Sequence, residues 1–316
     1  MASILVTGGA GFIGSHVCEA LLNRGDSVIC IDNLDPYYSP SIKEKNLEVC
    51  KKSSNFSFVK LDLLDKESLD EFFDKNPVDK VIHLAAKAGV RPSIKDPAGF
   101  AKVNILGTIN LLEAVKERKL ANFLFASSSS VYGDSSLPFS EDSKVDSPIS
   151  PYAATKKAGE LLCASYHNLY HIPITCLRFF TVYGPRGRPD MAPFKFTKAI
   201  LEGRQIELYG DGSSRRDYTY ITDIVSGLLS ALDKNLDFEI INLGESHTVE
   251  LKEFIKVIEK ALGKKAKVNH VQSQPGDVKA TYADISKAKA LLGYDPKIRI
   301  DEGMRLFAEW LKVARC

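Results

Sequence analysis

Residues 3–14 read SILVTGGAGFIG, a short apolar segment that runs into three regularly spaced glycines. The apolar segment is typical of a buried strand, and Gly8, Gly11 and Gly14 lie where the chain would turn from that strand into a helix. In a dinucleotide-binding turn, such glycines allow a tight bend, close approach of the backbone to pyrophosphate and close helix–strand contact. The amino end of the helix offers unpaired N–H groups to a phosphate. The stretch therefore predicts a Rossmann-like fold.

A carboxylate follows the second predicted strand. Asp32 ends the apolar run at residues 27–32, 18 residues after Gly14. A carboxylate there accepts hydrogen bonds from a ribose 2′-hydroxyl and repels a 2′-phosphate, which favours NAD over NADP. Asp62 follows the third predicted strand. It either reaches the adenine edge or caps a helix that starts near Asp65, and the sequence leaves both roles open.

Short apolar runs alternate with helical stretches through the first half of the chain. Strands are expected at residues 3–7, 27–32, 56–61, 80–85 and 122–126, and helices at 12–24, 104–119 and 151–170. This alternation is typical of an α/β fold in which a doubly wound parallel sheet is covered by helices on both faces.

The composition of the sequence changes after about residue 180, where proline, glycine and arginine become frequent. Residues 221–232 and 238–243 again read as a helix and a buried strand, so we expect residues 218–245 to return to the first domain. The expected organisation is a NAD-binding Rossmann domain at residues 1–178. A smaller C-terminal α/β substrate domain would consist of residues 179–217 and 246–316.

The composition is that of an ordinary globular protein. The chain has 316 residues, 44% apolar and 26% charged, with a net charge of +2 that gives no reason to expect nucleic acid or an anionic membrane as partner. No apolar run approaches the ~18 residues of a membrane span. The six cysteines have no metal-ligand spacing, so we expect no metal and a reduced, cytoplasmic protein.

Tyr152 and Lys156 lie four residues apart in the predicted helix at residues 151–170. That spacing puts both side chains on one face, one turn apart. Because a free tyrosine has a pKa near 10, only about one phenol in a thousand is ionised at pH 7. A neighbouring ammonium favours the phenolate and would make Tyr152 a usable base. Such a pair also occurs by chance on exposed helices, so other residues must support the assignment.

That support lies upstream, where residues 126–133 read ASSSSVYG directly after a predicted strand. Doubly wound folds bind ligands at the carboxyl edge of the sheet, where this run would lie. A serine there can bridge a substrate hydroxyl and the phenol of Tyr152. The serine run therefore favours Tyr152 and Lys156 as catalytic groups.

In the order of these motifs, the chain resembles the extended short-chain dehydrogenase/reductase family of nucleotide-sugar-modifying enzymes over nearly its whole length. Further motifs that carry the resemblance are residues 83–86 (HLAA), Asn104, residues 177–185 (LRFFTVYGP) and residues 210–218 (GDGSSRRDY). The resemblance implies that Ser128 is the hydroxyl partner of Tyr152 and that Lys156 holds the nicotinamide ribose.

The resemblance also assigns the wider site. The catalytic residues are expected to be Ser128, Ser129, Tyr152 and Lys156. The expected NAD contacts are Gly8, Gly11, Phe12, Ile13, Gly14, Asp32, Asn33, Asp62, Leu63, Leu84, Ala85, Ala86, Asn104, Tyr152 and Lys156.

Small departures indicate the reaction. Sugar dehydratases of the family carry an Asp-Glu pair where this chain has Ser129 and Ser130, and nucleotide-glucuronate decarboxylases usually carry Glu at the position of Ser130. Without those acids, C4 epimerisation is the favoured reaction. Residues 179–192 (FFTVYGPRGRPDMA) look most like UDP-glucuronate 4-epimerases, since UDP-glucose 4-epimerases usually have Asn at the position of Thr181. A UDP-glucose/UDP-galactose epimerase or a decarboxylase stays open as an alternative.

A UDP-uronate would need a cation for its carboxylate. Guanidinium matches carboxylate bidentately, so Arg188 is the candidate clamp and Thr181 a hydrogen-bond donor beside it. Arg216 is expected at the diphosphate and Asp277 at the uridine ribose, while Gln274 stands where many UDP-hexose epimerases have a phosphate-binding arginine. The full set of expected substrate contacts is Ser128, Ser129, Thr181, Arg188, Arg216 and Asp277.

The sequence supports three further expectations. His83 lies inside an apolar strand, which favours a structural role over acid–base catalysis. The predicted helices at residues 104–119 and 151–170 resemble those that pair subunits in this family, which implies a homodimer. A non-catalytic NAD-sensing protein is disfavoured because Tyr152, Lys156 and the serine run are all present.

Overall fold

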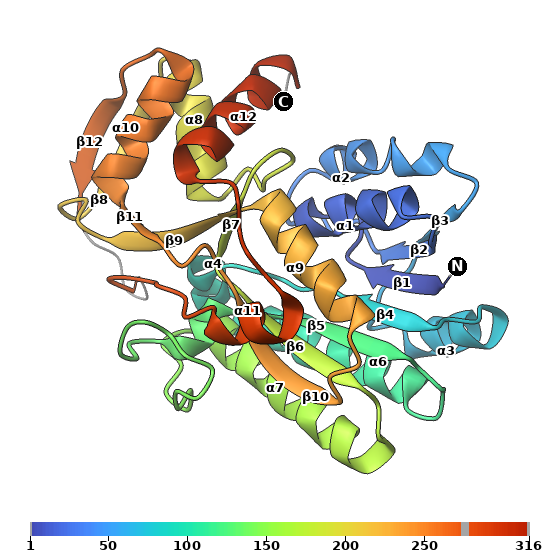
Figure 1. The fold of residues 1–316 in the computed structure, drawn as a ribbon. Coiled ribbons are helices and arrows are strands. Elements are labelled where there is room, and N and C mark those ends of the chain that lie inside the picture. The colour runs from blue at the N-terminus through green and yellow to red at the C-terminus, as the bar shows by residue number, and fades with distance from the viewer. Residues whose placement is uncertain (1, 273–277, 315–316) are drawn as a thin grey trace. The chain divides into compact units, whose positions relative to one another are not determined.

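The computed structural model describes residues 2–272 and 278–314 (Figure 1). The chain divides into two compact units. Unit 1 consists of Met1–Gly133, Lys144–Arg178 and Val225–Ile241, and unit 2 of Asp134–Ser143, Phe179–Ile224 and Asn242–Cys316. In the described part of the chain, none of the helices combines the length and apolar character needed to cross a bilayer.

A seven-stranded sheet with the order β10-β6-β5-β4-β1-β2-β3 forms the centre of unit 1. The strand pairs β1–β2, β1–β4, β2–β3 and β4–β5 are parallel. This sheet confirms the predicted Rossmann-like fold, and the strand order reverses beside β1, the place where such folds bind ligands. The strands are β1 (Ser3–Thr7), β2 (Ser27–Asp32), β3 (Phe56–Lys60), β4 (Lys80–His83), β5 (Asn122–Ser128), β6 (Ile174–Phe179) and β10 (Phe238–Leu243).

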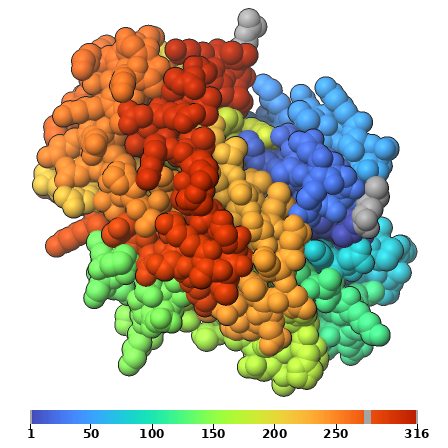
Figure 2. Space-filling view, viewed as in Figure 1, coloured from blue at the N-terminus to red at the C-terminus, as the bar shows by residue number. Residues whose placement is uncertain are grey.

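Apolar strands explain the core of this unit. All seven residues of β5 and all six of β6 are buried, as expected for central strands covered on both faces. Helix α7 lies along β5 (Figure 1). The space-filling view shows the chain from α1 to α3, coloured blue to cyan, as one continuous surface (Figure 2). The helices are α1 (Phe12–Asn23), α2 (Pro40–Asn46), α3 (Lys66–Lys75), α4 (Val90–Lys95), α5 (Pro97–Ala101), α6 (Gly107–Val115) and α7 (Pro151–Tyr170).

The helix predicted at residues 104–119 is present, but both of its ends differ from the prediction. It begins earlier, in a π-helical turn at Lys102–Leu106, and ends earlier, where α6 ends at Val115. The predicted helix at residues 151–170 agrees with α7 at both ends, because Ser150 accepts a hydrogen bond from the Ala153 N–H as N-cap and Pro151 occupies the first turn.

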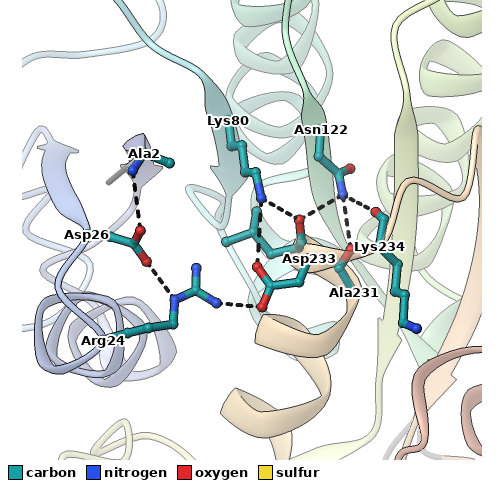
Figure 3. A network of polar contacts seen from close by, with 9 residues as sticks. Ala2, Arg24, Asp26, Lys80, Asn122, Ala231, Asp233 and Lys234 are labelled. Carbon is teal, nitrogen blue, oxygen red and sulfur yellow. Dashed lines mark hydrogen bonds and ion pairs between the residues drawn. The ribbon is translucent and has the colours of Figure 1, made fainter.

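A polar network ties the end of α9 (Ile221–Asp233) to the amino ends of the strands (Figure 3). Asp233 pairs with Arg24 at 2.7 Å, and Arg24 in turn binds Asp26 at 2.6 Å. Lys80 donates to a carbonyl oxygen at the end of α9 at 3.0 Å, and the Asn122 amide donates to three carbonyl oxygens there. These contacts show how residues 225–241 belong to unit 1 after the chain has passed through unit 2.

Unit 2 contains two small sheets. In the first, with the order β11-β9-β7, β9 runs parallel to β7 and antiparallel to β11; in the second, β8 and β12 are parallel. Aromatic side chains fill its core: the Tyr218 ring stacks on Phe254 with centroids 4.3 Å apart. The elements are β7 (Thr181–Tyr183), α8 (Ala192–Leu201), β8 (Gln205–Tyr209), β9 (Arg215–Tyr220), β11 (Thr248–Glu250), α10 (Leu251–Leu262), β12 (Lys267–Val271), α11 (Ser286–Leu292) and α12 (Ile300–Val313).

Candidate active site

The glycine loop between β1 and α1 has the geometry of a phosphate cradle. Gly8 has a φ of +70°, and a Cβ there would lie 2.7 Å from the Ala85 nitrogen. A Cβ on Gly14 would lie 2.3 Å from the Gly8 carbonyl oxygen, so helix and loop can approach this closely only because residue 14 is glycine. Gly11 caps α1 without a side chain, so a ligand can approach the first-turn N–H groups of α1, where Phe12 is buried and Ile13 half-buried. The loop therefore suits the pyrophosphate of a dinucleotide.

Asp32 ends β2 and is only 6% exposed. Its carboxylate accepts hydrogen bonds from the Ala10 N–H at 3.2 Å and the Leu34 N–H at 2.8 Å, which fix it against the glycine loop. A carboxylate can accept about four hydrogen bonds. Asp32 therefore retains acceptor positions for a ribose hydroxyl.

The structure decides between the two roles left open for Asp62. Asp65, not Asp62, is the N-cap of α3 and accepts from the Ser68 N–H at 3.1 Å. Asp62 accepts instead from the Leu64 N–H and from the Asn33 amide at 2.9 Å. The capping alternative for Asp62 is therefore wrong. The contact with Asp62 brings Asn33, which follows β2, together with the segment that follows β3.

The residues after β4 also border the glycine loop. Ala85 donates its N–H to Thr7 Oγ1 at 3.3 Å, and this segment, which includes Leu84 and Ala86, packs against Gly8. Leu63, 8% exposed, follows β3 at the same edge of the sheet.

Asn104 is 3% exposed and acts as a cross-link. Its side chain accepts from the Lys87 N–H and donates to the Lys87 carbonyl and to Thr155 Oγ1 on α7. These contacts hold the segment after β4 against α7, so Asn104 shapes the candidate site through the backbone. Direct contact of Asn104 with a cofactor stays a prediction.

The first turns of α7 carry the predicted catalytic pair. The Tyr152 N–H donates to Ser93 Oγ at 3.0 Å, and the Tyr152 ring meets Phe100 edge-on. Ser93 is fully buried and donates its own hydroxyl to the Val90 carbonyl. The start of the helix is therefore fixed by a second segment as well as by its own cap.

Lys156 is a buried cation. It is 5% exposed, its Nζ donates to the Ala126 carbonyl at 2.6 Å, and it lies 5.1 Å from the centre of the Phe125 ring. Burial lowers the pKa of Lys156 to about 8, while Cys163 and Glu160 oppose that shift. The side chain is therefore still mostly an ammonium at pH 7. It provides a fixed positive charge at the end of β5, one helical turn from Tyr152.

The serine run divides into different roles. Ser127 is turned away from the site and donates to Glu160 Oε1 at 2.6 Å. Ser128, at the end of β5, accepts from the Ser130 N–H at 3.1 Å as cap of the short helix Ser129–Tyr132, which leaves its O–H available to donate. Ser129 follows, half-buried. Contact of Ser128 and Ser129 with a substrate hydroxyl stays a prediction.

A buried ion pair between α7 and β6 was not predicted from the sequence. Glu160 and Arg178 are each 1% exposed and form two hydrogen bonds of 2.7 and 2.8 Å, while the Arg178 guanidinium lies 4.8 Å from the Tyr132 ring centre. The pair joins α7 to β6 and, through Ser127, to β5. An arginine inside the otherwise apolar run of β6 was the available signal, because such a charge needs a partner.

His83 has the structural environment that its position suggested. It is 2% exposed, with Nδ1 2.8 Å from Thr7 Oγ1 and Nε2 3.0 Å from Thr108 Oγ1. Because Thr108 donates its hydroxyl to the Asn104 carbonyl, we assign the ring proton to Nε2. Burial lowers the pKa of His83 to about 3, and nearby Lys156 adds to the shift. His83 is therefore neutral at physiological pH.

The predicted substrate contacts lie in unit 2. Thr181, half-buried, starts β7 opposite Tyr218 of β9, and Arg216 lies two residues before Tyr218, on the same side of that strand. Arg188 forms a bidentate pair with Asp190, at 3.0 and 2.6 Å, which the sequence did not predict. Asp277 and Gln274 lie outside the described residues.

Within the described part of the chain, no group of three or more His, Cys, Asp or Glu side chains could hold a metal ion. What unit 1 offers is a dinucleotide cradle and a tyrosine one turn from a fixed ammonium. With the serines at the end of β5, these groups can remove the proton of a carbinol and stabilise its oxygen. Fold and residues together define a short-chain dehydrogenase/reductase-type protein.

Comparison with known proteins identifies the family of this chain. The profile of the family described as GDP-mannose 4,6 dehydratase matches residues 5–307, and the chain therefore belongs to this extended short-chain dehydrogenase/reductase family. The UDP-glucuronate 4-epimerase of Thermodesulfobacterium geofontis is 47% identical over 313 residues, which span 99% of this chain and 97% of the relative.

Solved structures agree with this relationship. The UDP-glucuronic acid 4-epimerase of Bacillus cereus, in complex with UDP-glucuronic acid and NAD, is 43% identical, with a TM-score of 0.94 over 98% of this chain and 99% of the other. The UDP-glucose 4-epimerase of Thermotoga maritima, with UDP-glucose, is 32% identical, with a TM-score of 0.91 over 99% and 100% of the two chains.

Proposed function

We propose that this protein is an NAD-dependent 4-epimerase that interconverts UDP-glucuronate and UDP-galacturonate through a 4-keto intermediate. The observation that carries the proposal is the buried ammonium of Lys156, one helical turn from Tyr152 on α7, in the unit that also contains the glycine loop and Asp32. Similarity at 47% identity to a UDP-glucuronate 4-epimerase supports the choice of substrate, as do Thr181 and Arg188 in unit 2.

The chain's own residues account for the proton chemistry. Tyr152, as phenolate, accepts the proton of the C4 hydroxyl, and the ammonium of Lys156 keeps the phenolate form accessible at neutral pH. Ser128 donates its hydroxyl proton toward the phenol and orients the sugar oxygen. NAD, when bound, supplies the hydride acceptor and donor at C4. Inversion requires the 4-keto sugar to present its other face before C4 is reduced again.

A uronate poses a problem that a neutral hexose does not. Its 4-keto form is a β-keto acid, which loses CO2 when the carboxylate bond lies perpendicular to the carbonyl plane. Arg188 can hold a carboxylate through two parallel N–H donors, and Thr181 can add a third hydrogen bond. A fixed carboxylate suppresses that loss and separates an epimerase from a decarboxylase.

Incubation of the purified chain with UDP-glucuronate, and separately with UDP-glucose, tests the proposal. We expect inversion at C4 of the uronate without release of CO2, followed by NMR. The Tyr152→Phe variant should lose about 10³-fold or more in turnover, because a phenyl ring cannot accept a proton, yet it should still bind NAD. Preference for UDP-glucose would favour a hexose epimerase, and stoichiometric CO2 a decarboxylase. Near-normal turnover by Tyr152→Phe would exclude Tyr152 as the base.

Arg188 should discriminate between the two substrates. Arg188→Ala should reduce kcat/KM for UDP-glucuronate by about 100-fold, the effect of losing a bidentate charged contact, and change it much less for UDP-glucose. Asp190→Asn is the matched variant, because it releases the guanidinium from its bidentate partner and should lower KM for the uronate. Equal losses of both substrates in Arg188→Ala would remove Arg188 from the carboxylate site.

We also propose that the protein forms a homodimer through α7 and the turn before α6. Large apolar side chains are exposed there: Leu161 at 59%, Leu169 at 66% and Tyr170 at 38% on α7, and Leu106 at 44% in the π-helical turn. That turn packs on α7, so these side chains belong to one region of unit 1. Leu161→Glu should yield monomers in analytical ultracentrifugation. Val49→Glu, equally exposed outside this region, should leave the dimer intact.

We place the enzyme in the cytoplasm. Cys18, Cys30, Cys163 and Cys176 are free, buried thiols. Unpaired thiols of this kind suit a reducing compartment. Fluorescence microscopy of a tagged chain in cells would test this location.

A further inference from the structure

Lys43, on α2, is buried beside the carboxylate assigned to the adenosine ribose. The residue is 7% exposed, and its Nζ lies 3.8 Å from Asp32 Oδ1. No sequence motif marks this residue, which lies 11 residues beyond Asp32 in a stretch without a glycine turn. Lysine is seldom buried without a close partner, so the position of Lys43 next to a predicted ligand contact indicates a function.

The ammonium of Lys43 has unused hydrogen-bonding capacity. Among the described residues its contacts are the Asp32 carboxylate and the face of the Tyr38 ring, whose centre is 5.0 Å away. At 3.8 Å the first is longer than a hydrogen bond, and the second is a cation–π contact. An ammonium carries three N–H donors, and burial without acceptors is costly. The side chain is therefore prepared for an acceptor that a ligand would bring.

The surroundings of Lys43 show where that acceptor would lie. Asp32 binds the Ala10 N–H, and Asn46, one turn after Lys43, donates to the Ala10 carbonyl at 3.0 Å. The Tyr38 hydroxyl lies 3.8 Å from the position that a Cβ on Gly11 would take. Helix α2 is thus fastened over the glycine loop, with Lys43 at the end of β2 where a Rossmann fold places the ribose of the adenosine.

We propose that Lys43 is a second determinant of cofactor choice, a cation that serves the ribose of NAD and that would bind the 2′-phosphate of NADP if Asp32 did not neutralise it. The inference rests on the proposed function, since it assumes a dinucleotide in this site. With NAD, Lys43 donates to a ribose hydroxyl while Asp32 accepts from one. With NADP, the Asp32 charge opposes the 2′-phosphate. In Rossmann enzymes that accept NADP, an arginine near the ribose binds the 2′-phosphate.

Competitive binding of NAD and NADP measures the contribution of Lys43 to cofactor choice. The full chain and its variants are incubated with mixtures of NAD and NADP, desalted rapidly, and the bound dinucleotides are quantified by chromatography. Asp32→Asn keeps the shape and one acceptor but removes the charge, so the bound NADP/NAD ratio should rise at least tenfold. In Asp32→Asn/Lys43→Met the ratio should fall back at least tenfold, whereas Lys43→Met alone should show no gain of NADP.

A charge-retaining double variant and a fallback single variant complete the experiment. Asp32→Asn/Lys43→Arg retains the positive charge and should keep the gain in NADP binding. If Asp32→Asn does not fold, Lys43→Met alone decides: it should weaken NADP binding more than NAD binding relative to the wild type. An equal ratio in Asp32→Asn with and without Lys43, or equal losses of both dinucleotides in Lys43→Met, overturns the inference. A wild-type chain that binds neither dinucleotide overturns the proposed function instead.

Discussion

Two glutamates of this protein are buried to nearly the same degree and differ in charge preference. Glu160 in unit 1 is 1% exposed and Glu245 in unit 2 is 5% exposed. Burial alone would raise the pKa of Glu160, but the hydrogen bonds and charge of Arg178 bring it below its usual value. Burial raises the pKa of Glu245 to about 7, against the opposing charge of Arg299 and with the help of Asp223 and Asp217.

The difference lies in the partner. Arg178 is itself buried and meets Glu160 with two N–H groups, while Ser127 supplies a third donor. Arg299 meets Glu245 at 3.0 Å, but its side chain is 66% exposed and solvated. A buried carboxylate is therefore kept ionised by fixed donors, and a partner that remains in water does not suffice. In unit 1, Arg178 and Ser127 are such donors to Glu160 of α7.

Removal of one partner from the buried Glu160–Arg178 pair should have the largest effect on stability. Arg178→Met leaves the Glu160 carboxylate buried without its main donor, and the free energy of unfolding should fall by about 3–5 kcal/mol at pH 7. Urea denaturation measures this loss. The matched double variant Arg178→Met/Glu160→Gln has no uncompensated charge and should recover part of the stability. A loss below about 1 kcal/mol in Arg178→Met would contradict the assignment of Glu160 as a charged, paired group.

Lys156 extends the comparison to a buried cation whose hydrogen-bond partner is a carbonyl rather than a carboxylate. Its pKa is lowered to about 8 from 10.5, so between these values the unfolded chain binds more protons than the folded one. Stability should therefore rise with pH across this window, by up to about 3 kcal/mol. Denaturation at pH 7.5 to 10 measures the slope.

The variant Lys156→Met should lose this part of the slope, because methionine cannot bind the proton. Lys75→Met, in which an exposed lysine is removed, controls for the titration of surface lysines. If wild type and Lys156→Met keep parallel stability curves up to pH 10, the Lys156 ammonium is not destabilised by burial.

The sequence predicted most of the fold because its signals are local. The apolar strands, the glycine turn and the cap formed by Ser150 each depend on neighbouring residues, and α7 was predicted with both ends correct. The start of the helix at residues 104–119 was missed because a π-helical turn precedes α6, and no residue pattern marks such a turn. The sequence predicted that residues 218–245 return to the first domain, but the bounds of the segment that belongs to unit 1, residues 225–241, depend on contacts such as Arg24–Asp233, which join segments 209 residues apart.

The site residues that could be predicted from the sequence are those that belong to a motif with a characteristic spacing. Spacing after the glycine turn indicated Asp32, and spacing together with the upstream serine run indicated the pair Tyr152 and Lys156. Spacing did not indicate Lys43 or the Glu160–Arg178 pair, because their roles arise from burial and from partners distant in sequence. For Asp62 the motif left two roles, and only the observed cap at Asp65 removed one of them.

The smallest expected effect concerns Glu245. Its pKa is raised from 4.5 to about 7, so between these values the folded chain binds more protons than the unfolded one, and stability is lost as pH rises through 7. Glu245→Gln stays neutral and should lack this loss. Relative to the wild type, the variant should gain about 2 kcal/mol in unfolding free energy between pH 5 and pH 8.

Glu253→Gln, on the exposed side of α10, serves as the matched control and should change by less than about 0.5 kcal/mol over the same range. Urea denaturation at four pH values would measure both variants. A gain that grows with pH in Glu245→Gln alone would mean that a carboxylate whose partner stays in solvent is destabilising at neutral pH. A gain that is constant with pH would mean that Glu245 is already ionised at pH 5, and that Arg299, although exposed, compensates it as Arg178 compensates Glu160.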